Sequence, residues 1–467
     1  MHARTTGWLA ILAIAALPLT APAAVPPEKA AKLGDELTPM GSNPAGNEAG
    51  TIPAWEGESV WTETQKNYTR AELERLRQEE PDKLNMVQGN AGDAAKPRFT
   101  ITSDNYRQYA DKLSEGHKAL FRLYPDYKMV VYPSMRGTFF PDEVNAATKR
   151  NATRATLEGT DDLSGAKLGF PFPIPNNGAE VIWNHKLRFR GSAVKRYNNQ
   201  AIVDADGDYQ ITKLIEDVRF EYANLNAEDR EDHVMAYYLQ RTLSPARVAG
   251  QITLVHEIFG KGTSGRNAWI YNPGLGRVNR APEVGYDNPS LGSDGLQFND
   301  QINMFNGSLS RYTWKLVGKK EIFVPHNSYK LNDARVKYAD IIQAGHINQD
   351  LPRYELHRVW VVEATLRDGY RHQFAKRRFY INEDSWGITM VDCYDSRGEL
   401  WKFQEGHLVA APFIPTTTTI PEVIYDLQSG RYFLTAMANE DQINDFEIQY
   451  DRSHFQPSSL KRMGSRY

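Results

Sequence analysis

The sequence predicts a mainly β protein with peripheral helices, built on one large, curved antiparallel sheet or open barrel. About ten segments alternate apolar and polar residues with the period of a strand. Turn pairs that contain glycine separate several of these segments. No helical pattern alternates with the strands over enough residues to connect parallel strands, so the strands are expected to meander.

The first residues predict export. His2 and Arg4 precede a small-apolar run from Trp8 to Leu17, and the run is followed by Leu19-Thr-Ala-Pro-Ala-Ala24. A charged start, a short apolar centre and an Ala-x-Ala exit make up a secretory signal, so we predict a signal peptide over residues 1–23. The run is too short to span a bilayer, and no later apolar stretch reaches that length. A buried N-terminal helix is the alternative, which the prolines directly behind the run disfavour.

The composition narrows the class of protein further. Cys393 is the single cysteine, so the chain has no internal disulfide and no multi-cysteine metal site, and the signal carries no cysteine for a lipid anchor. The net charge of -3, with both signs interleaved, disfavours a nucleic-acid-binding surface. We therefore expect a soluble protein in the periplasm of a Gram-negative bacterium, without a membrane anchor and without a nucleic-acid partner.

Residues 24–164 are predicted to form a helix- and loop-rich segment that wraps around the remainder of the chain. The segment from Thr69 begins with a capping residue and places Glu72 three positions later, the arrangement of a capping box. The helices expected in this part are Glu28 to Glu36, Thr69 to Gln78, Asp104 to Leu123 and Pro141 to Leu157.

Residues 165–467 are predicted to form the antiparallel β half-barrel with its lid loops. The tight turns expected between strands are Asp206-Gly207, Asp368-Gly369 and Arg397-Gly398, because each glycine suits a left-handed turn position. The expected strands are Val181 to Phe189, Tyr209 to Tyr222, Val234 to Leu243, Gln251 to Phe259, Asn267 to Tyr271, Tyr312 to Leu316, Glu355 to Leu366, Arg378 to Ile381, Trp386 to Tyr394 and Leu400 to Gln404.

No pattern in the sequence predicts a catalytic residue, a metal or a cofactor. Gly260 to Gly265 fits Gly-x-Gly-x-x-Gly, but a strand pattern follows where a phosphate loop needs a helix, so we interpret it as a hairpin loop. Asp204 to Asp208 lacks the spacing of a calcium loop. The 11 histidines are scattered, and none has the spacing of a helical zinc motif.

Aromatic residues that alternate with aliphatic ones are the candidate ligand contacts. On a closed sandwich such stripes would be core, whereas on an incompletely closed sheet they would line a groove for an apolar ligand. The candidates are Trp183, Trp269, Tyr271, Trp360, Val362, Trp386, Ile388 and Met390.

Several segments resemble one family of exported proteins. The turn-rich stretch from Ala31 to Trp55 is similar to the opening signature of the domain-of-unknown-function family thirteen-twenty-nine. The later segments that resemble it are Phe170 to His185, Ala268 to Arg280 with its acidic continuation to Phe305, and Arg378 to Trp386 with the following stretch to Lys402. Together they cover nearly all of the chain after the signal.

The resemblance implies a fold similar to the outer-membrane lipoprotein-sorting proteins LolA and LolB, an incomplete barrel whose open side is closed by helices. It also implies a carrier that shields a lipid or another hydrophobic compound in the periplasm. The partners it implies are an outer-membrane β protein and an inner-membrane exporter of the resistance-nodulation-division type.

A periplasmic carrier is therefore the function that the sequence favours, without an enzymatic role. A periplasmic hydrolase acting on a lipid or polyester is the alternative, with catalytic groups brought together only by the fold. A structural partner of an outer-membrane protein is a third hypothesis, and it would present a flat apolar patch in place of a cavity.

Overall fold

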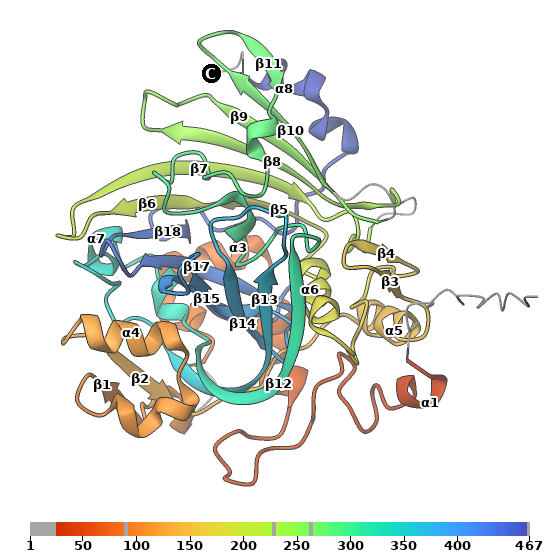
Figure 1. Cartoon of the computed structure of the whole chain (residues 1–467), viewed down its shortest axis with the longest axis vertical. Coiled ribbons are helices and arrows are strands. Elements are labelled where there is room, and N and C mark those ends of the chain that lie inside the picture. The colour runs from red at the N-terminus through yellow and green to blue at the C-terminus, as the bar shows by residue number, and fades with distance from the viewer. Residues whose placement is uncertain (1–24, 88–91, 227–229, 261–264, 465–467) are drawn as a thin grey trace, which may run out of the picture.

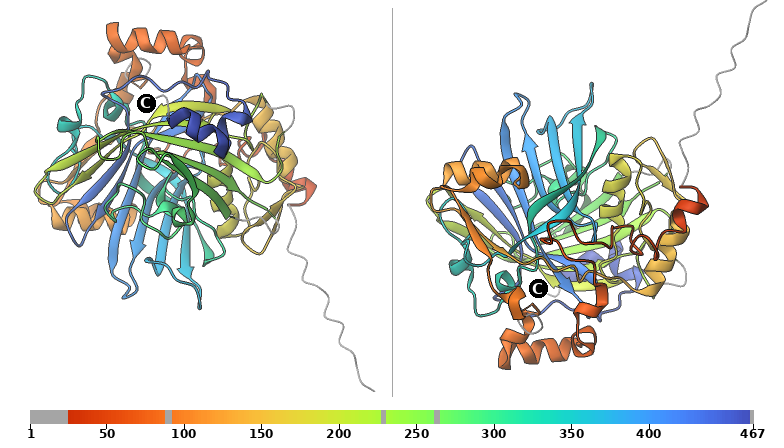
Figure 2. Two further views of the ribbon diagram at one scale, coloured as in Figure 1. Left: turned by 90° about the horizontal axis from the view of Figure 1, so that it is seen from above. Right: turned by 90° about the horizontal axis from the view of Figure 1, so that it is seen from below.

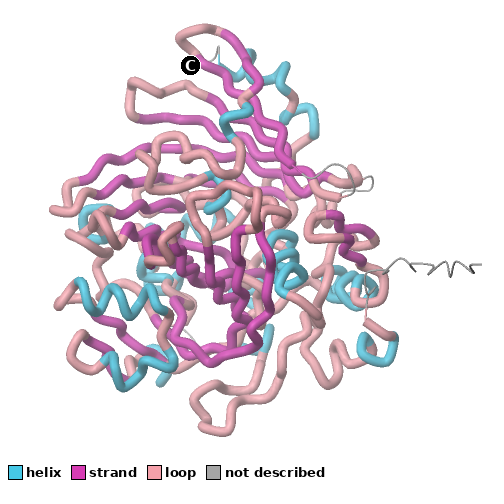
Figure 3. Tube along the Cα trace, viewed as in Figure 1, coloured by secondary structure: helices cyan, strands magenta, loops and turns pink. Residues whose placement is uncertain are grey.

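The computed structural model describes residues 25–87, 92–226, 230–260 and 265–464, and one sheet organises most of them (Figures 1 and 3). Within this part of the chain, sixteen strands join in the sheet, and the main path runs β1-β2-β13-β14-β15-β16-β17-β18-β6-β7-β8-β9-β10-β11. β12 pairs with β13, and β5 pairs with β7, off this path. Its two end strands, β1 and β11, do not pair with each other, so the sheet is not closed into a barrel.

The bounds of the strands show how far along the chain the sheet extends. The strands are β1 (Phe99–Thr102), β2 (Lys128–Tyr132), β3 (Thr156–Glu158), β4 (Asp162–Ser164), β5 (Ala193–Tyr197), β6 (Asn199–Val203), β7 (Tyr209–Arg219), β8 (Val234–Ser244), β9 (Ile252–Ile258), β10 (Gly265–Asn272), β11 (Arg277–Arg280), β12 (Tyr312–Pro325), β13 (Tyr354–Leu366), β14 (Lys376–Asn382), β15 (Ile388–Tyr394), β16 (Leu400–Ala411), β17 (Thr416–Asp426) and β18 (Tyr432–Met437). β3 and β4 form a separate hairpin.

The helices are short and lie around the sheet (Figure 3). The α-helices are α1 (Pro27–Ala30), α2 (Glu63–Lys66), α3 (Arg70–Glu79), α4 (Glu115–Leu123), α5 (Asp142–Asn151), α6 (Gly178–Leu187), α7 (Tyr338–Ile341) and α8 (Pro457–Gly464). The 3-10 turns are η1 (Gly57–Val60), η2 (Pro81–Leu84), η3 (Gly92–Ala95), η4 (Tyr106–Lys112), η5 (Pro282–Val284), η6 (Asn299–Gln301), η7 (Tyr329–Asn332) and η8 (Arg452–Phe455).

The prediction of a mainly β fold with a large open sheet and peripheral helices is confirmed. Neighbouring strands are antiparallel except for β2 and β13, which run parallel where Val131 pairs with Tyr354. β1 and β2 precede residue 164, so the N-terminal segment adds strands to the sheet as well as helices and loops. The sheet is therefore mixed, with one parallel pair in an otherwise antiparallel order.

The central strands are buried on both faces. On β13, Val359 and Val361 belong to one hydrophobic cluster, while the alternate residues Val362 and Ala364 belong to another. Because successive side chains of a strand point to opposite faces, the two clusters lie on opposite sides of the sheet. β14 repeats the arrangement, with Phe379 and Tyr380 in different clusters.

Each face is covered by its own set of elements. α4, β1, β2 and α7 contribute buried side chains to the cluster around Val359, which we call the first core. α5, α6 and the loop before β12 contribute to the cluster around Val362, which we call the second core. In Figure 2 the α2–α3 segment, drawn in orange, stands out from the body of the molecule.

The strand predicted over Val181 to Phe189 is wrong, because these residues belong mostly to α6. Asn177 caps the helix by accepting a hydrogen bond from the Glu180 backbone N–H at 3.0 Å. All ten residues of α6 are buried, so the helix has no polar face whose period would reveal it. Gly178 permits the close approach to the sheet, since a Cβ there would lie 2.8 Å from a methyl group of Val362.

The other helix predictions are confirmed in part. α3 begins after Thr69 with both hydrogen bonds of the capping box to Glu72. The helix expected over Asp104 to Leu123 is split into η4 and α4, because Ser114 caps a new helix. α1 is shorter than predicted, and α5 ends before β3 begins.

The three predicted glycine turns are confirmed. Gly207, Gly369 and Gly398 have φ values of 93°, 83° and 81°, and each lies between two paired strands. β9 and β10 also pair across residues 259–264, as the hairpin interpretation of Gly260 to Gly265 requires. Residues 261–264 of that loop lie outside the described residues.

The predicted signal peptide, residues 1–23, lies outside the described residues. Across the residues that the structure does describe, no helix has the length and apolar character needed to cross a membrane.

Trp386 links the N-terminal loop that contains Met40 to the sheet. We expect its replacement to lower the stability of the folded protein. Its indole is fully buried, stacks on Trp360 with ring centroids 6.0 Å apart, and donates a 3.0 Å hydrogen bond to the Met40 carbonyl. Trp386→Ala should lower the free energy of unfolding by about 3–5 kcal/mol, because it leaves a large cavity. Urea denaturation measures this, with Leu275→Ala as the control, since Leu275 is 65% exposed. Equal stability of the two variants would contradict the assigned packing.

Candidate functional site

A cavity of about 160 Å³ lies against one face of the strands β7, β8 and β9. Alternate residues line it: Glu216, Val218 and Phe220 from β7 and the residue after it, Ala236, Tyr238 and Gln240 from β8, and Thr253, Val255 and Glu257 from β9. The period of two shows that one continuous face of the sheet forms this wall.

Segments from several other parts of the chain complete the cavity. Lys186 and Arg188 come from the end of α6, and Arg190 follows two residues later. The loop before β12 contributes Ile302 and Asn303 among others, and β17 and β18 contribute Thr418, Thr419, Glu422 and Thr435. The wall opposite the strands is therefore built from residues far apart in the sequence.

Two arginines at the cavity share one neutral acceptor. Arg188 donates to Asn303 Oδ1 at 2.8 Å, and Arg190 donates to the same oxygen at 2.9 Å. Among the described residues, no carboxylate lies within ion-pair distance of either guanidinium, and the Nε atoms of both are buried without a hydrogen-bond partner. Burial lowers the pKa of Arg188 to about 10. These two charges are therefore only partly compensated by the protein.

Two other arginines that line the cavity are paired with carboxylates, and Lys186 has a neutral acceptor. Arg196 forms an ion pair with Glu216, and Arg266 donates from Nε to Glu257 at 2.8 Å. Lys186 donates to the carbonyl of Gly307, and burial lowers the pKa of its ammonium. Among the described residues, the cavity's positive charges without a carboxylate within ion-pair distance are thus Lys186, Arg188 and Arg190, all at or just after the end of α6.

Glu422 is the nearby carboxyl that remains outside these ion pairs. It accepts a 3.2 Å hydrogen bond from the Met304 backbone N–H. Burial raises the pKa of Glu422 to about 6, although the surrounding arginines oppose this shift. A large part of its population is therefore neutral in mildly acidic solution.

Apolar surface adjoins these charged groups. Val218, Phe220, Met235 and Val255 line the cavity, and the guanidinium of Arg190 lies 4.7 Å from the ring centroid of Phe220. A cavity of this kind suits a ligand with both an apolar part and an anionic group.

A second cavity of about 140 Å³ adjoins β16 and β17, and its walls are mainly apolar. They include Leu73 of α3, Met86, Phe413, Ile420 and Phe446. Thr418 lines both cavities, so the two approach each other at this strand.

Comparison with known proteins identifies the family. The family model described as "Protein of unknown function (DUF1329)" matches residues 100–461. The uncharacterized protein PA3922 of Pseudomonas aeruginosa is 44% identical over 463 residues, which cover 98% of each chain. The chain belongs to the DUF1329 family. The family resemblance found in the sequence is confirmed.

Solved structures similar to this DUF1329 chain include a DUF1329 family protein and a LolA superfamily protein. A DUF1329 family protein from Desulfovibrio piger is 15% identical, with a TM-score of 0.40, and the match covers 58% of this chain and 92% of that one. The LolA superfamily protein NE2245 from Nitrosomonas europaea is 12% identical, with a TM-score of 0.36, covering 60% and 98%. These likenesses concern the fold.

The eight ligand contacts predicted from the sequence lie in packed clusters. Trp183, Val362, Trp386 and Ile388 belong to the second core and Met390 to the first, and each is 2% exposed or less. Trp360 is partly buried against the second core. Neither cavity, as the described residues delimit it, includes any of the eight. Their contact with a ligand stays a prediction.

Trp269 and Tyr271 point away from the cavity. They pack with Tyr237, Leu239 and Phe455, on the outer face of β8 to β10, which η8 and α8 cover. Tyr271 lies directly against Gly464, where a Cβ would come within 2.0 Å of its ring. The C-terminal helix thus occupies the surface where the sequence predicted a ligand.

The sequence analysis missed the basic residues of the cavity. Lys186, Arg188 and Arg190 alternate with Leu187 and Phe189, which is an unusual pattern for a buried apolar segment. This alternation of basic and apolar residues is the one sequence pattern that could have indicated buried basic side chains at the cavity. Their common acceptor, Asn303, lies more than a hundred residues away and could not be paired with them from one sequence.

Potential metal ligands do not gather at the cavity. Among the described residues, the one group of three histidine or acidic side chains close enough to share an ion is His326, Glu355 and His357, which lies elsewhere in the interior.

We expect Glu422 to make folding stability depend on pH. A carboxyl whose pKa is raised in the folded state binds protons more tightly there, so its contribution to stability falls as pH rises from about 4.5 through 6. Glu422→Gln replaces the carboxyl by a group that does not titrate, so this pH-dependent loss of stability should be absent from the variant. The difference in unfolding free energy between variant and wild type should grow by about 2 kcal/mol between pH 4.5 and pH 7.

Urea denaturation at pH 4.5, 5.5, 6.5 and 7.5 measures the difference, since other titrating groups contribute equally to both proteins. Glu399→Gln, at an exposed position, is the matched control for the loss of one charge. Parallel pH profiles of Glu422→Gln and wild type would show that burial does not perturb this carboxyl.

Proposed function

We propose that the protein is a periplasmic carrier for a hydrophobic molecule that bears an anionic group, such as a fatty acid. The observation that supports it is the pair Arg188 and Arg190 beside an apolar wall, because the two share one neutral acceptor and no carboxylate of the described residues lies within ion-pair distance. Both features fit one amphipathic ligand.

The electrostatics favour an anion at this position. A buried charge costs free energy unless it is paired, and a guanidinium matches the two oxygens of a carboxylate or phosphate. The free protein carries that cost at Arg188 and Arg190. A bound anion would offset it, so part of the binding free energy would come from the unpaired state of the empty site.

The first cavity is too small to hold the whole of a long acyl chain. A cavity of about 150 Å³ accommodates a molecule of the size of benzene. The first cavity, at about 160 Å³, therefore holds a head group and a few methylenes. We propose that the remainder of the chain passes Thr418 into the second, more apolar cavity, with displacement of side chains at β17.

The place of the carrier in the cell is part of the proposal. The predicted signal peptide supports export, and the family resemblance supports movement of the ligand between the inner and outer membranes. We propose an inner-membrane exporter of the resistance-nodulation-division type and an outer-membrane β protein as partners. Apolar burial supplies affinity at about 25 cal/mol per Å², which requires no catalytic group.

The hydrolase alternative receives less support from the cavity. Among the described residues that line it there is no histidine or cysteine, so the cavity does not assemble a Ser–His or Cys–His pair. We therefore retain the carrier as the proposed function.

Arg190→Gln and Arg188→Gln should each weaken the binding of a fluorescent fatty acid roughly tenfold or more at neutral pH, because each removes a hydrogen bond to a charged group. Wild type should also prefer the acid to the corresponding alcohol, and the variants should lose that preference. Fluorescence titration measures both effects. Arg277→Gln, on exposed β11, is the matched control.

The carrier proposal fails if wild type binds neither the fatty acid nor the alcohol and if no lipid is extracted from the purified protein by mass spectrometry. Equal binding by wild type and both arginine variants would leave a hydrophobic carrier but would overturn the anionic site.

Thr418→Trp tests whether both cavities hold one chain. The larger side chain would fill the position shared by the two cavities. We expect the affinity for hexadecanoate to fall roughly tenfold, while that for butanoate, which needs only the first cavity, stays within about twofold. Competition against the fluorescent probe measures both ligands. An equal loss for both chain lengths would contradict the shared path.

A further inference from the structure

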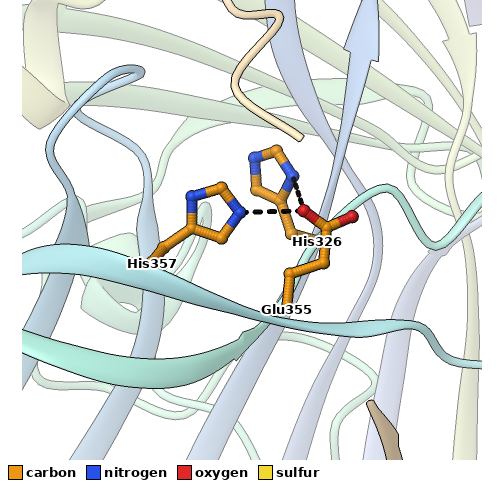
Figure 4. Close-up of side chains that lie close together, drawn as sticks. All are labelled: His326, Glu355 and His357. Atoms are coloured by element: carbon orange, nitrogen blue, oxygen red, sulfur yellow. Dashed lines mark hydrogen bonds and ion pairs between the residues drawn. The ribbon is translucent and has the colours of Figure 1, made fainter. Parts of the chain in front are cut away.

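Three potential metal ligands converge where β12 ends beside β13 (Figure 4). Glu355 and His357 are two positions apart on β13, so they point to the same face. His326 follows the last residue of β12, and its backbone N–H donates to the Arg353 carbonyl at 3.0 Å, which continues the pairing of the two strands. The strand register therefore brings the three side chains together.

The donor atoms of the three side chains lie close to one another. His357 Nε2 is 2.9 Å from Glu355 Oε2, and His326 Nδ1 is 3.8 Å from the same oxygen. All three donor positions fall within 4.8 Å of one another. Glu355 is fully buried, and each histidine is 2% exposed.

His326 is the side chain that indicates a missing partner. Both of its ring nitrogens are buried, and neither has a hydrogen-bond partner among the described residues. Buried polar groups are nearly always satisfied, because an unpaired one costs about 1–3 kcal/mol. An imidazole always offers a lone pair when neutral, which is the form that binds metals.

Hydrogen bonds from Asn327, Arg353 and Met135 hold the carboxylate of Glu355 in one orientation. Its Oε1 accepts from Asn327 Nδ2 at 3.0 Å and from Arg353 Nε at 2.5 Å. Its Oε2 accepts from the backbone N–H of Met135 at 2.8 Å and faces the two histidines. Partners of this kind orient the ligands of metal sites, and they leave Oε2 as the oxygen available to an ion.

We propose that His326, Glu355 and His357 bind one divalent transition-metal ion, with zinc as the first candidate. Zinc lies about 2.0–2.2 Å from nitrogen and oxygen ligands, so ligand atoms in a tetrahedral site are about 3.3 Å apart. The observed separations of 2.9 and 3.8 Å lie on either side of that value. Small side-chain rotations would suffice.

On metal binding, His357 would replace its hydrogen bond to Glu355 by a bond to the ion, with no change in the number of protons on the ring. In the free protein its Nε2–H donates to Glu355, and in the bound protein Nε2 would give its lone pair to the ion while the ring takes the other neutral tautomer. The structure brings three protein ligands together, so a tetrahedral zinc ion would take water as its fourth ligand. The near-complete burial of the three side chains separates the site from bulk solvent.

The ion would fix the start of the segment between β12 and β13. This segment includes Tyr329, Asn332 and Ala334, which line the second cavity. Binding at His326 would therefore stabilise one wall of that cavity. The inference does not rest on the proposed ligand, since the three side chains belong to neither cavity wall.

Zinc binding by the full chain tests the inference. After treatment with a chelator and its removal, titration with zinc chloride followed by calorimetry and by elemental analysis should show one zinc per chain and a higher Tm. His326→Gln and His357→Gln should weaken that binding roughly 100-fold or more, because each removes a direct ligand. Cobalt(II) should give the visible absorption of a low-coordinate nitrogen and oxygen site in wild type alone.

His407→Gln is the matched control, because His407 is also fully buried with both ring nitrogens unpartnered but lies outside the group. This variant should retain zinc. His326→Phe keeps an apolar ring in the same space, and circular dichroism shows whether it folds. The inference is overturned if folded wild type binds no zinc, if His326→Phe folds and binds zinc as tightly as wild type, or if His407→Gln loses the ion.

Discussion

The need to cover both faces of β13 to β15 determines most of the structure. These strands place apolar side chains alternately in the first and second cores, so neither face tolerates water. One cover comes from α4, β1, β2 and α7, and the other from α5 and α6. Elements from both sides of residue 164 are therefore required, and the N-terminal segment is part of the core of the fold.

The first cavity lies beside β7, β8 and β9, where one face of the sheet is only partly covered by other elements. Along β7 to β10 the outer face is packed against η8 and α8, whereas the inner face meets α6 and the loop before β12 only in part. Polar and charged side chains occupy the space that remains. α6 is anchored in the second core, and this anchoring places Arg188 and Arg190, just after the helix, beside the apolar wall.

The sequence predicted what local chemistry determines. The strands predicted from alternation, except Val181 to Phe189, are present as expected, and so are the glycine turns and the capping box of α3. α6 was missed because a helix buried all round has no amphipathic period, and β17 was missed because its run of threonines and Pro421 has no alternation. The aromatic stripes are real, but a period-two pattern does not distinguish a groove from a covered face. The cavity and the group around His326 depend on contacts between residues far apart in the chain, which one sequence does not contain.

The pairing of β18 with β6 has a consequence for how the molecule is assembled. It joins residues 432–437 to residues 199–203, so the chain must bring together segments more than two hundred residues apart before this part of the sheet exists. Contacts of such separation form slowly, because the entropy of the intervening loop is lost first. Any molecule that recognises the cavity would bind only the fully assembled chain, and so its binding would report that folding is complete.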